Sequence, residues 1–271
     1  MRLSNVSFRY SRRGPWIFRG VDLDLPGGAV LEVTGRNGAG KSTLLKLLAG
    51  VMPPTGGRIV DRPDGVGYAP EVFPAAQPFS AAAYLAHLAR VRGAAPAEIG
   101  TWAERLGMSH LLAVPLAELS KGSGQKVGIL QALLGTPGLV ILDEPFSGLD
   151  ARTREDLRTI IGEVAGRGGI VVVSDHQNAL RGLAHTTRLL VEDGTIRAVA
   201  VEERPAPRPR KVVEVVVDAD EADDVRRALQ AEGRRARIRD FTTADEDRWD
   251  LVGAGDDQGG ELESQAMRGR A

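Results

Sequence analysis

The sequence predicts an α/β fold, because short apolar stretches that fit buried strands alternate with stretches that fit helices. A glycine-rich loop at 35–43 joins the apolar strand expected at 29–33 to a leucine-rich helix. Farther along the chain, a second apolar stretch at 139–142 ends in two acidic residues. Together these features place a nucleotide-phosphate site at the centre of the predicted fold.

The glycine-rich loop fits the pattern G-x-x-x-x-G-K-[ST], called Walker A, and so predicts a P-loop NTPase core. Its glycines let the backbone curl so that successive N–H groups point at an anion. Lys41 adds positive charge for the β- and γ-phosphates, and Ser42 offers a hydroxyl to Mg²⁺. The residues expected to contact the nucleotide are Gly35, Arg36, Asn37, Gly38, Ala39, Gly40, Lys41, Ser42 and Thr43.

The apolar stretch 139–142 predicts a buried strand that ends in Asp143 and Glu144, the Walker B pattern. Two adjacent carboxylates at the end of a buried strand are costly unless a cation or hydrogen bonds compensate them. Asp143 is therefore predicted to hold Mg²⁺, and Glu144 to orient or deprotonate water.

Composition bounds the class of protein. The 271 residues are enough for one large domain and a small one, and 42% hydrophobic with 26% charged residues is ordinary for a globular chain. A net charge of −1 gives no electrostatic reason to expect a nucleic-acid partner. The absence of cysteine excludes disulfides and thiolate metal sites. We expect a cytoplasmic protein with no membrane-spanning segment.

The pattern predicts several domains and subdomains. Strands at 3–10 and 17–25 form a hairpin of an antiparallel β subdomain, with short strands at 58–61 and 65–69. A helical subdomain covers about 73–135, and strands at 186–192 and 195–201 close a main domain of residues 1–202. The remaining chain predicts a Pro-rich linker at 203–210, a small α/β appendage at 211–252 with a helix at 221–231, and a disordered tail at 253–271.

Four further places each allow two interpretations. Tyr10 either stacks on a bound base or is only an aromatic at a strand end. Glu71 either reaches a metal or water, or is an exposed loop carboxylate. His176, just past the core strand at 169–173, either faces a ligand or caps the strand. Ser120 and Gly122 either begin an anion-binding helix or form an ordinary N-cap.

The ordered set of motifs resembles the nucleotide-binding subunits of ATP-binding cassette (ABC) transporters over about residues 1–200. In that family, Walker A is followed by a Q-loop, a helical subdomain, an LSGGQ-like signature, Walker B, a D-loop and a switch histidine. Two positions depart from the pattern, because Glu71 stands where Gln is usual and the signature at 119–123 reads LSKGS. The matching positions are Tyr10 for adenine stacking, Glu71 for the Q-loop, Leu119–Ser123 for the signature, Ser147–Asp150 for the D-loop and His176 for the switch.

The resemblance implies an ATP hydrolase that uses ATP and Mg²⁺. Ser120 and Gly122 would complete the γ-phosphate site of a second cassette in trans, in a homodimer or heterodimer. Glu144 would polarise the attacking water and His176 would steady the γ-phosphate. Ser42 and Asp143 would hold the Mg²⁺, and Glu71 would also reach it.

The resemblance also implies a partner, a separate transmembrane permease subunit at the inner face of the cell membrane. The variant signature is similar to that of exporter-type cassettes. The docking surface is predicted around the irregular stretch 71–79, where Phe73 and Phe79 are each either an exposed anchor of that surface or packed under the helices. Two alternatives are a non-transport ABC ATPase acting on nucleic acid or the ribosome, and a regulatory module with little hydrolysis.

Overall fold

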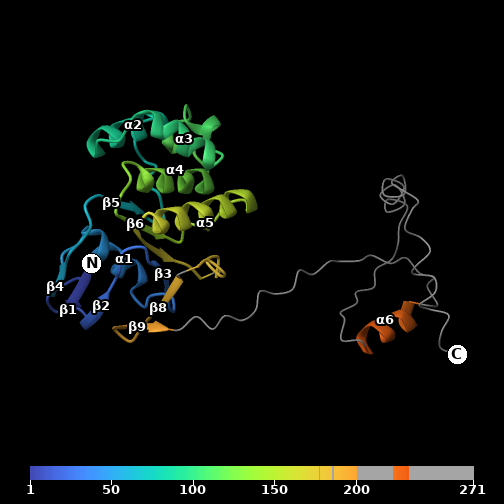
Figure 1. The fold of residues 1–271 in the computed structure, drawn as a ribbon, viewed down its shortest axis with the longest axis horizontal. Helices are drawn as coiled ribbons and strands as arrows, with labels where there is room; N and C mark the ends of the chain where they lie inside the picture. The colour runs from blue at the N-terminus through green and yellow to red at the C-terminus, as the bar shows by residue number, and fades with distance from the viewer. Residues whose placement is uncertain (177, 185, 200–221, 232–271) are drawn as a thin grey trace. The chain divides into compact units, whose positions relative to one another are not determined.

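The computed structural model describes residues 1–176, 178–184, 186–199 and 222–231. The chain divides into two compact units, residues 1–206 and 207–271. The first unit contains two sheets and five α-helices among its described residues (Figure 1). No helix of the described residues is long and apolar enough to cross a membrane.

The larger sheet has the strand order β5-β6-β7-β3-β8-β9. Its first five strands run parallel, and β9 pairs antiparallel with β8, which confirms the predicted closing hairpin. The central strands are buried on both faces, as their nearly continuous apolar sequences require. The strands are β3 (Val30–Thr34), β5 (Val66–Ala69), β6 (Leu139–Asp143), β7 (Ile170–Ser174), β8 (Thr186–Glu192) and β9 (Thr195–Val199).

The smaller sheet is antiparallel and has the order β2-β1-β4. It confirms the predicted hairpin, with β1 at Arg2–Phe8 and β2 at Phe18–Asp24. The strand β4 (Gly56–Val60) joins the other side of β1, a pairing that local sequence does not indicate. Leu3, Val6 and Phe8 of β1 point into the core, so the predicted alternation is interrupted between Leu3 and Val6. The register shifts there, and Asn5 has φ 50°.

The helix α1 (Lys41–Ala49) lies between the two sheets. Its buried leucines pack against β1 and β2 on one side and against β3, β6 and β7 on the other. Gly50 ends the helix with φ 76°, a left-handed conformation that favours glycine. This packing fixes the phosphate loop, which joins β3 to α1.

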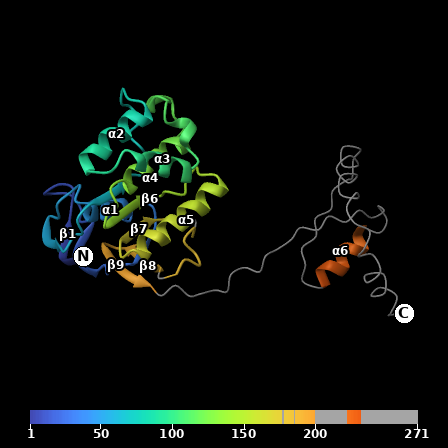
Figure 2. The same cartoon turned by 45° about the horizontal axis from the view of Figure 1, so that its top comes forward.

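The helices α4 (Lys121–Leu133) and α5 (Ala151–Gly166) cover the other face of the larger sheet. The helices α2 (Ala81–Arg92) and α3 (Ala97–Arg105) lie together beyond α4, at one end of the unit (Figures 1 and 2). Two short 3₁₀ turns, η1 (Ser109–Leu111) and η2 (Leu116–Glu118), connect α3 to α4. Side-chain caps begin α2, α4 and α5 at Ser80, Ser120 and Asp150.

In the second unit the structure describes one helix, α6 (Ala222–Ala231), which confirms the helix predicted at 221–231. The predicted linker at 203–210, the other expected elements of the appendage and the predicted tail at 253–271 lie outside the described residues.

Candidate nucleotide site

The phosphate loop curls tightly between β3 and α1. Gly35, Gly38 and Gly40 all have positive φ, at 149°, 81° and 108°. A Cβ on Gly35 would overlap the carbonyl oxygen of Val191, so only glycine fits there. The Lys41 ammonium lies back across the loop and donates to the Gly35 carbonyl at 2.9 Å. The loop is therefore pre-shaped around its lysine, with α1 beginning directly behind it.

The carboxyl ends of β6 and β7 are joined by a short hydrogen-bond chain. The Ser174 hydroxyl donates to Asp143 Oδ1 at 2.6 Å, and the backbone N–H of Glu144 donates to Ser174 Oγ at 2.8 Å. Asp143 and Ser174 are buried and face each other in register. The sequence analysis did not predict Ser174 as a site residue. It could have been found from its position at the end of a core strand, because the strand with Walker B also ends at this edge of the sheet.

Glu144 and His176 meet at the same edge of the sheet. His176 Nδ1 is 2.6 Å from Glu144 Oε2, and His176 is exposed while the Glu144 side chain is largely covered. Burial raises the pKa of Glu144, and this effect outweighs the opposing hydrogen bond and charge of His176 and the charge of Lys41. A carboxylate with a raised pKa is a stronger base, so the arrangement can accept a proton from bound water.

Tyr10 extends toward the phosphate loop from the end of β1. Its hydroxyl shares a 2.8 Å hydrogen bond with Thr43 Oγ1, and its ring packs edge-to-face on Phe8 at 5.0 Å between centroids. The side chain is nevertheless 63% exposed. The ring is held beside the loop with most of its surface open, which suits stacking against a planar group.

Tyr68 is a residue near the site that sequence reasoning missed. Its hydroxyl is buried and has no hydrogen-bond partner among the described residues. Burial raises the pKa of Tyr68 to about 12, with smaller contributions from the charges of Asp143 and Tyr10. Tyr68 could have been found from its position near the end of β5, three residues before Glu71.

Comparisons with known proteins now identify the family. A family model described as ABC transporter matches residues 18–147. The chain is 32% identical over 193 residues to the cytochrome c biogenesis ATP-binding export protein CcmA of Pseudomonas syringae pv. syringae (strain B728a), with 66% of this chain and 90% of that protein covered. This chain belongs to the ABC transporter ATP-binding family. It is an ATP hydrolase of that family.

Other relatives of this ABC ATPase carry import names. It is 34% identical to the aliphatic sulfonates import ATP-binding protein SsuB of Pseudomonas entomophila (strain L48), over 72% of this chain and 74% of that protein. The solved structure of an ATP-binding subunit of an ABC transporter has the same fold, with TM-score 0.66 and 24% identity over 93% of this chain and 98% of that chain. The predicted resemblance is confirmed, while the names of relatives point in both directions of transport.

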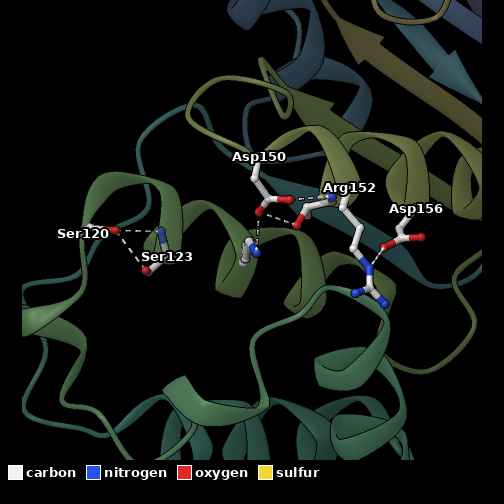
Figure 3. A network of polar contacts seen from close by, with 7 residues as sticks. Ser120, Ser123, Asp150, Arg152 and Asp156 are labelled. Carbon is white, nitrogen blue, oxygen red and sulfur yellow. Dashed lines mark hydrogen bonds and ion pairs between the residues drawn. The ribbon is translucent and has the colours of Figure 1, made fainter. Parts of the chain in front are cut away.

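The start of α4 holds Ser120 and Gly122, and of these two Gly122 lies against loop 147–150. Ser120 Oγ accepts a hydrogen bond from the Ser123 backbone N–H at 3.1 Å and donates to Ser123 Oγ at 2.9 Å, as Figure 3 shows. A Cβ on Gly122 would lie 2.5 Å from the Gly148 carbonyl oxygen. In the part of the chain that the structure describes, these contacts tie Ser120 and Gly122 to their own helix and to loop 147–150, rather than to loop 35–43.

A second link joins α4 to the start of α5. The Lys126 ammonium lies 3.2 Å from Asp150 Oδ2, and Asp150 Oδ1 accepts the Thr153 backbone N–H at 2.8 Å. In Figure 3, Asp150 stands apart from Ser120 and Ser123, with the Arg152–Asp156 pair beyond it on α5. The signature helix and the D-loop therefore form one connected unit within a single cassette.

The Q-loop residue Glu71 is exposed, and no described residue gives it a hydrogen bond or ion pair. The strand before it is tied to the helical subdomain, because the Gln131 amide donates to the Tyr68 carbonyl at 2.9 Å. Gln131 also accepts the Tyr84 hydroxyl of α2 at 2.6 Å. The end of β5, two residues before Glu71, is thus joined through Gln131 to α2 and α4.

Of the two interpretations of Phe73, the exposed anchor is wrong and packing under the helices is confirmed. Its side chain is 8% exposed, packs edge-to-face on Tyr84 and lies against Gly124 and Gly128 of α4. Two glycines one helical turn apart leave a groove on α4, and the ring fills it. Phe79 is 50% exposed, in agreement with the anchor interpretation, and Val72 of the same stretch is 72% exposed.

Proposed function

We propose that this ABC ATPase is the motor subunit of a transporter whose membrane-spanning permease is a separate chain. The observation that supports the proposal best is the convergence of Lys41, Asp143, Glu144 and His176 at one edge of the sheet. Such a set supplies phosphate binding, metal ligation, a base and a γ-phosphate contact in one place.

The chemistry of the loop and of Asp143 fits ATP with Mg²⁺. The loop forms a cradle in which a Cβ on Gly35 would overlap the Val191 carbonyl oxygen. The Lys41 ammonium, which donates to the Gly35 carbonyl, can turn to the phosphates instead. We assign Ser42 and Asp143 as the ligands of the metal. The hydrogen bond from the Ser174 hydroxyl to Asp143 Oδ1 orients the Asp143 carboxylate. Glu71 is a further candidate ligand. When bound, Mg²⁺ supplies charge neutralisation at the β- and γ-phosphates.

We assign the base to Glu144 and the γ-phosphate contact to His176. The raised pKa of Glu144 favours proton uptake from the attacking water, and the exposed imidazole can move toward phosphate without disturbing the core. Tyr10 is assigned to stacking on the adenine because its ring is open beside the loop.

Ser120 and Gly122 are assigned to the γ-phosphate of a second cassette, in a homodimer or heterodimer. Ser120 is exposed at the N-terminus of α4, where helix dipole and backbone N–H groups favour an anion. One chain carries one Walker set and one signature, so a pair of cassettes makes two complete sites.

The docking surface for the permease is assigned to loop 71–79, with Val72 and Phe79 as its apolar contacts. We propose export as the direction, which the LSKGS signature and the likeness to an export protein support. The subunit would then associate with the inner face of the cell membrane, and no nucleic-acid partner is expected.

Val72→Asp and Phe79→Asp test this assignment, with Val91→Asp as a matched control because Val91 is equally exposed on α2. The full chain is purified by affinity from detergent-solubilised membranes, and mass spectrometry identifies any companion with several apolar spans. We expect the two loop variants to keep ATP binding but to lose the companion and its stimulation of ATPase, while the control keeps both. A wild-type chain that never recovers a membrane protein would overturn the transporter assignment.

A further inference from the structure

A partly buried ion pair joins two neighbouring strands of the larger sheet, just before the phosphate loop, with Glu32 buried and the Arg188 side chain 29% exposed. Glu32 of β3 is 2% exposed and accepts a 2.8 Å hydrogen bond from Arg188 Nε of β8, its partner in the strand register. The other carboxylate oxygen of Glu32 is buried without a hydrogen-bond partner among the described residues. A half-satisfied buried charge pair gives little net stability compared with apolar side chains of similar size.

The same guanidinium also reaches the segment that follows His176. Arg188 Nη2 donates to Asn178 Oδ1 at 3.1 Å. Asn178 is two residues after His176 and adopts φ 55°, a left-handed turn. Glu32 is three residues before Gly35, the first residue of the phosphate loop. One arginine therefore connects the strand that leads into the phosphate loop with the turn that carries the imidazole.

Other contacts hold the rest of this segment from a different side. Arg158 of α5 donates to the carbonyls of Ala179 and Arg181, the latter at 2.9 Å. Leu180 is buried in the core shared with α5. These contacts fix the segment to α5, whereas the contact through Asn178 connects it to β8 and β3. Arg188 therefore joins Asn178 to Glu32 of β3, in addition to the backbone hydrogen bond from the Asp175 N–H to the Val33 carbonyl at 3.3 Å.

We propose that Glu32, Arg188 and Asn178 are positioning residues for His176. Glu32 orients the guanidinium, the guanidinium holds Asn178, and Asn178 sets where the imidazole stands relative to Glu144 and the phosphate loop. This inference rests on the role proposed above for His176. Its consequence is that loss of the connection lowers turnover while nucleotide binding stays intact, because the phosphate loop itself is unchanged.

Asn178→Gly is the most direct test, because glycine tolerates φ 55° and removes only the side-chain acceptor. We expect kcat for ATP hydrolysis to fall by about 10-fold to 100-fold, with the Kd for ATP within about twofold of wild type. Asn178→Asp keeps both the acceptor and the tolerance of a left-handed turn, so it is expected to retain near wild-type turnover.

The double variant Glu32→Leu/Arg188→Met tests the buried pair without leaving one charge unpaired. We expect a Tm equal to or above that of wild type, together with the same loss of kcat as Asn178→Gly. The matched control is Arg197→Met/Glu192→Gln, which removes an exposed ion pair of the β8–β9 hairpin and is expected to leave kcat unchanged. If the buried double variant does not fold, Asn178→Gly alone decides.

The kcat of the double variant His176→Ala/Asn178→Gly shows whether Asn178 acts through His176 or affects the structure more generally. If Asn178 acts through His176, the double variant is no slower than His176→Ala alone. A further loss of similar size, or wild-type kcat in Asn178→Gly, would overturn the inference and leave the role of His176 in place. Wild-type turnover in His176→Ala would overturn both that role and the inference.

Discussion

The two regions of this cassette that we assign to the γ-phosphate are built in opposite ways. At the carboxyl edge of the larger sheet, Asp143 and Ser174 are buried, hydrogen-bonded and in register. At the start of α4, Ser120 is exposed and bonds only locally, to Ser123. The first region is organised within one chain, whereas the second presents a helix N-terminus outward.

The difference shows how each region acquires its geometry. Strand register aligns side chains from segments far apart in the chain, so the sheet itself brings the residues of this edge together. A helix N-terminus needs only its cap, and its anion site becomes complete when a ligand or a partner arrives. Variants of the first region are therefore expected to affect chemistry or ATP affinity, and variants of the second to affect pairing.

The largest expected effect is that of Glu144→Gln. The amide keeps the size of the side chain but cannot accept a proton, so steady-state ATPase activity is expected to fall by about 10²–10⁴-fold. ATP binding should persist and trap a cassette dimer, which gel filtration with ATP and Mg²⁺ detects. Glu118→Gln, in the 3₁₀ turn before α4, is the control. Near wild-type turnover with only monomer present would contradict the role of Glu144.

The next effect is that of Lys41→Ala on ATP affinity. Loss of a charged hydrogen-bond donor at the phosphates is expected to cost about 1.5–3 kcal/mol of binding free energy, or roughly 10-fold to 150-fold in Kd. Isothermal titration calorimetry measures the change, and Lys46→Ala in the last turn of α1 is the matched control. Equal affinity in the two variants would remove Lys41 from the phosphate site.

Gly122→Ala tests the second region. The added Cβ would lie 2.5 Å from the Gly148 carbonyl, so the D-loop must shift, at a cost of about 1–3 kcal/mol in the free energy of unfolding. We expect dimerisation and ATPase activity to fall while monomer affinity for ATP persists. Gly100→Ala is the control because its Cβ would meet nothing within 4 Å. Unchanged ATPase and stability in Gly122→Ala would show that the contact is not needed.

The smallest effect is expected at the cap of α5. Hydrogen bonds from Thr153 and Lys126 lower the pKa of Asp150, so its contribution to stability is present above the usual Asp pKa and is lost as pH falls through the folded value. Asp150→Ala is expected to cost about 1 kcal/mol at neutral pH. The Tm difference from wild type should shrink on acidification below about pH 4. A difference that is constant with pH would contradict this assignment.

Local sequence determined the parts of the site whose residues are neighbours in the chain. The loop 35–43, the acidic pair at 143–144 and the helix cap at Ser120 follow from spacing and residue type alone, because a turn, a strand end or a cap is a short-range structure. These elements agree between sequence and structure. The roles given to Ser120 and Gly122 in trans stay predictions.

Only the tertiary structure decided the contacts between distant segments. Phe73 is a core residue because its ring lies against Gly124 and Gly128 of α4, some 50 residues later in the chain. The residues around Phe73 in the sequence do not show this contact. Ser174 becomes a partner of Asp143, and Arg188 a partner of Glu32 and Asn178, through strand order and register. A one-residue change of register would reverse which side chains face each other, and the spacing of residues along one strand does not contain that information.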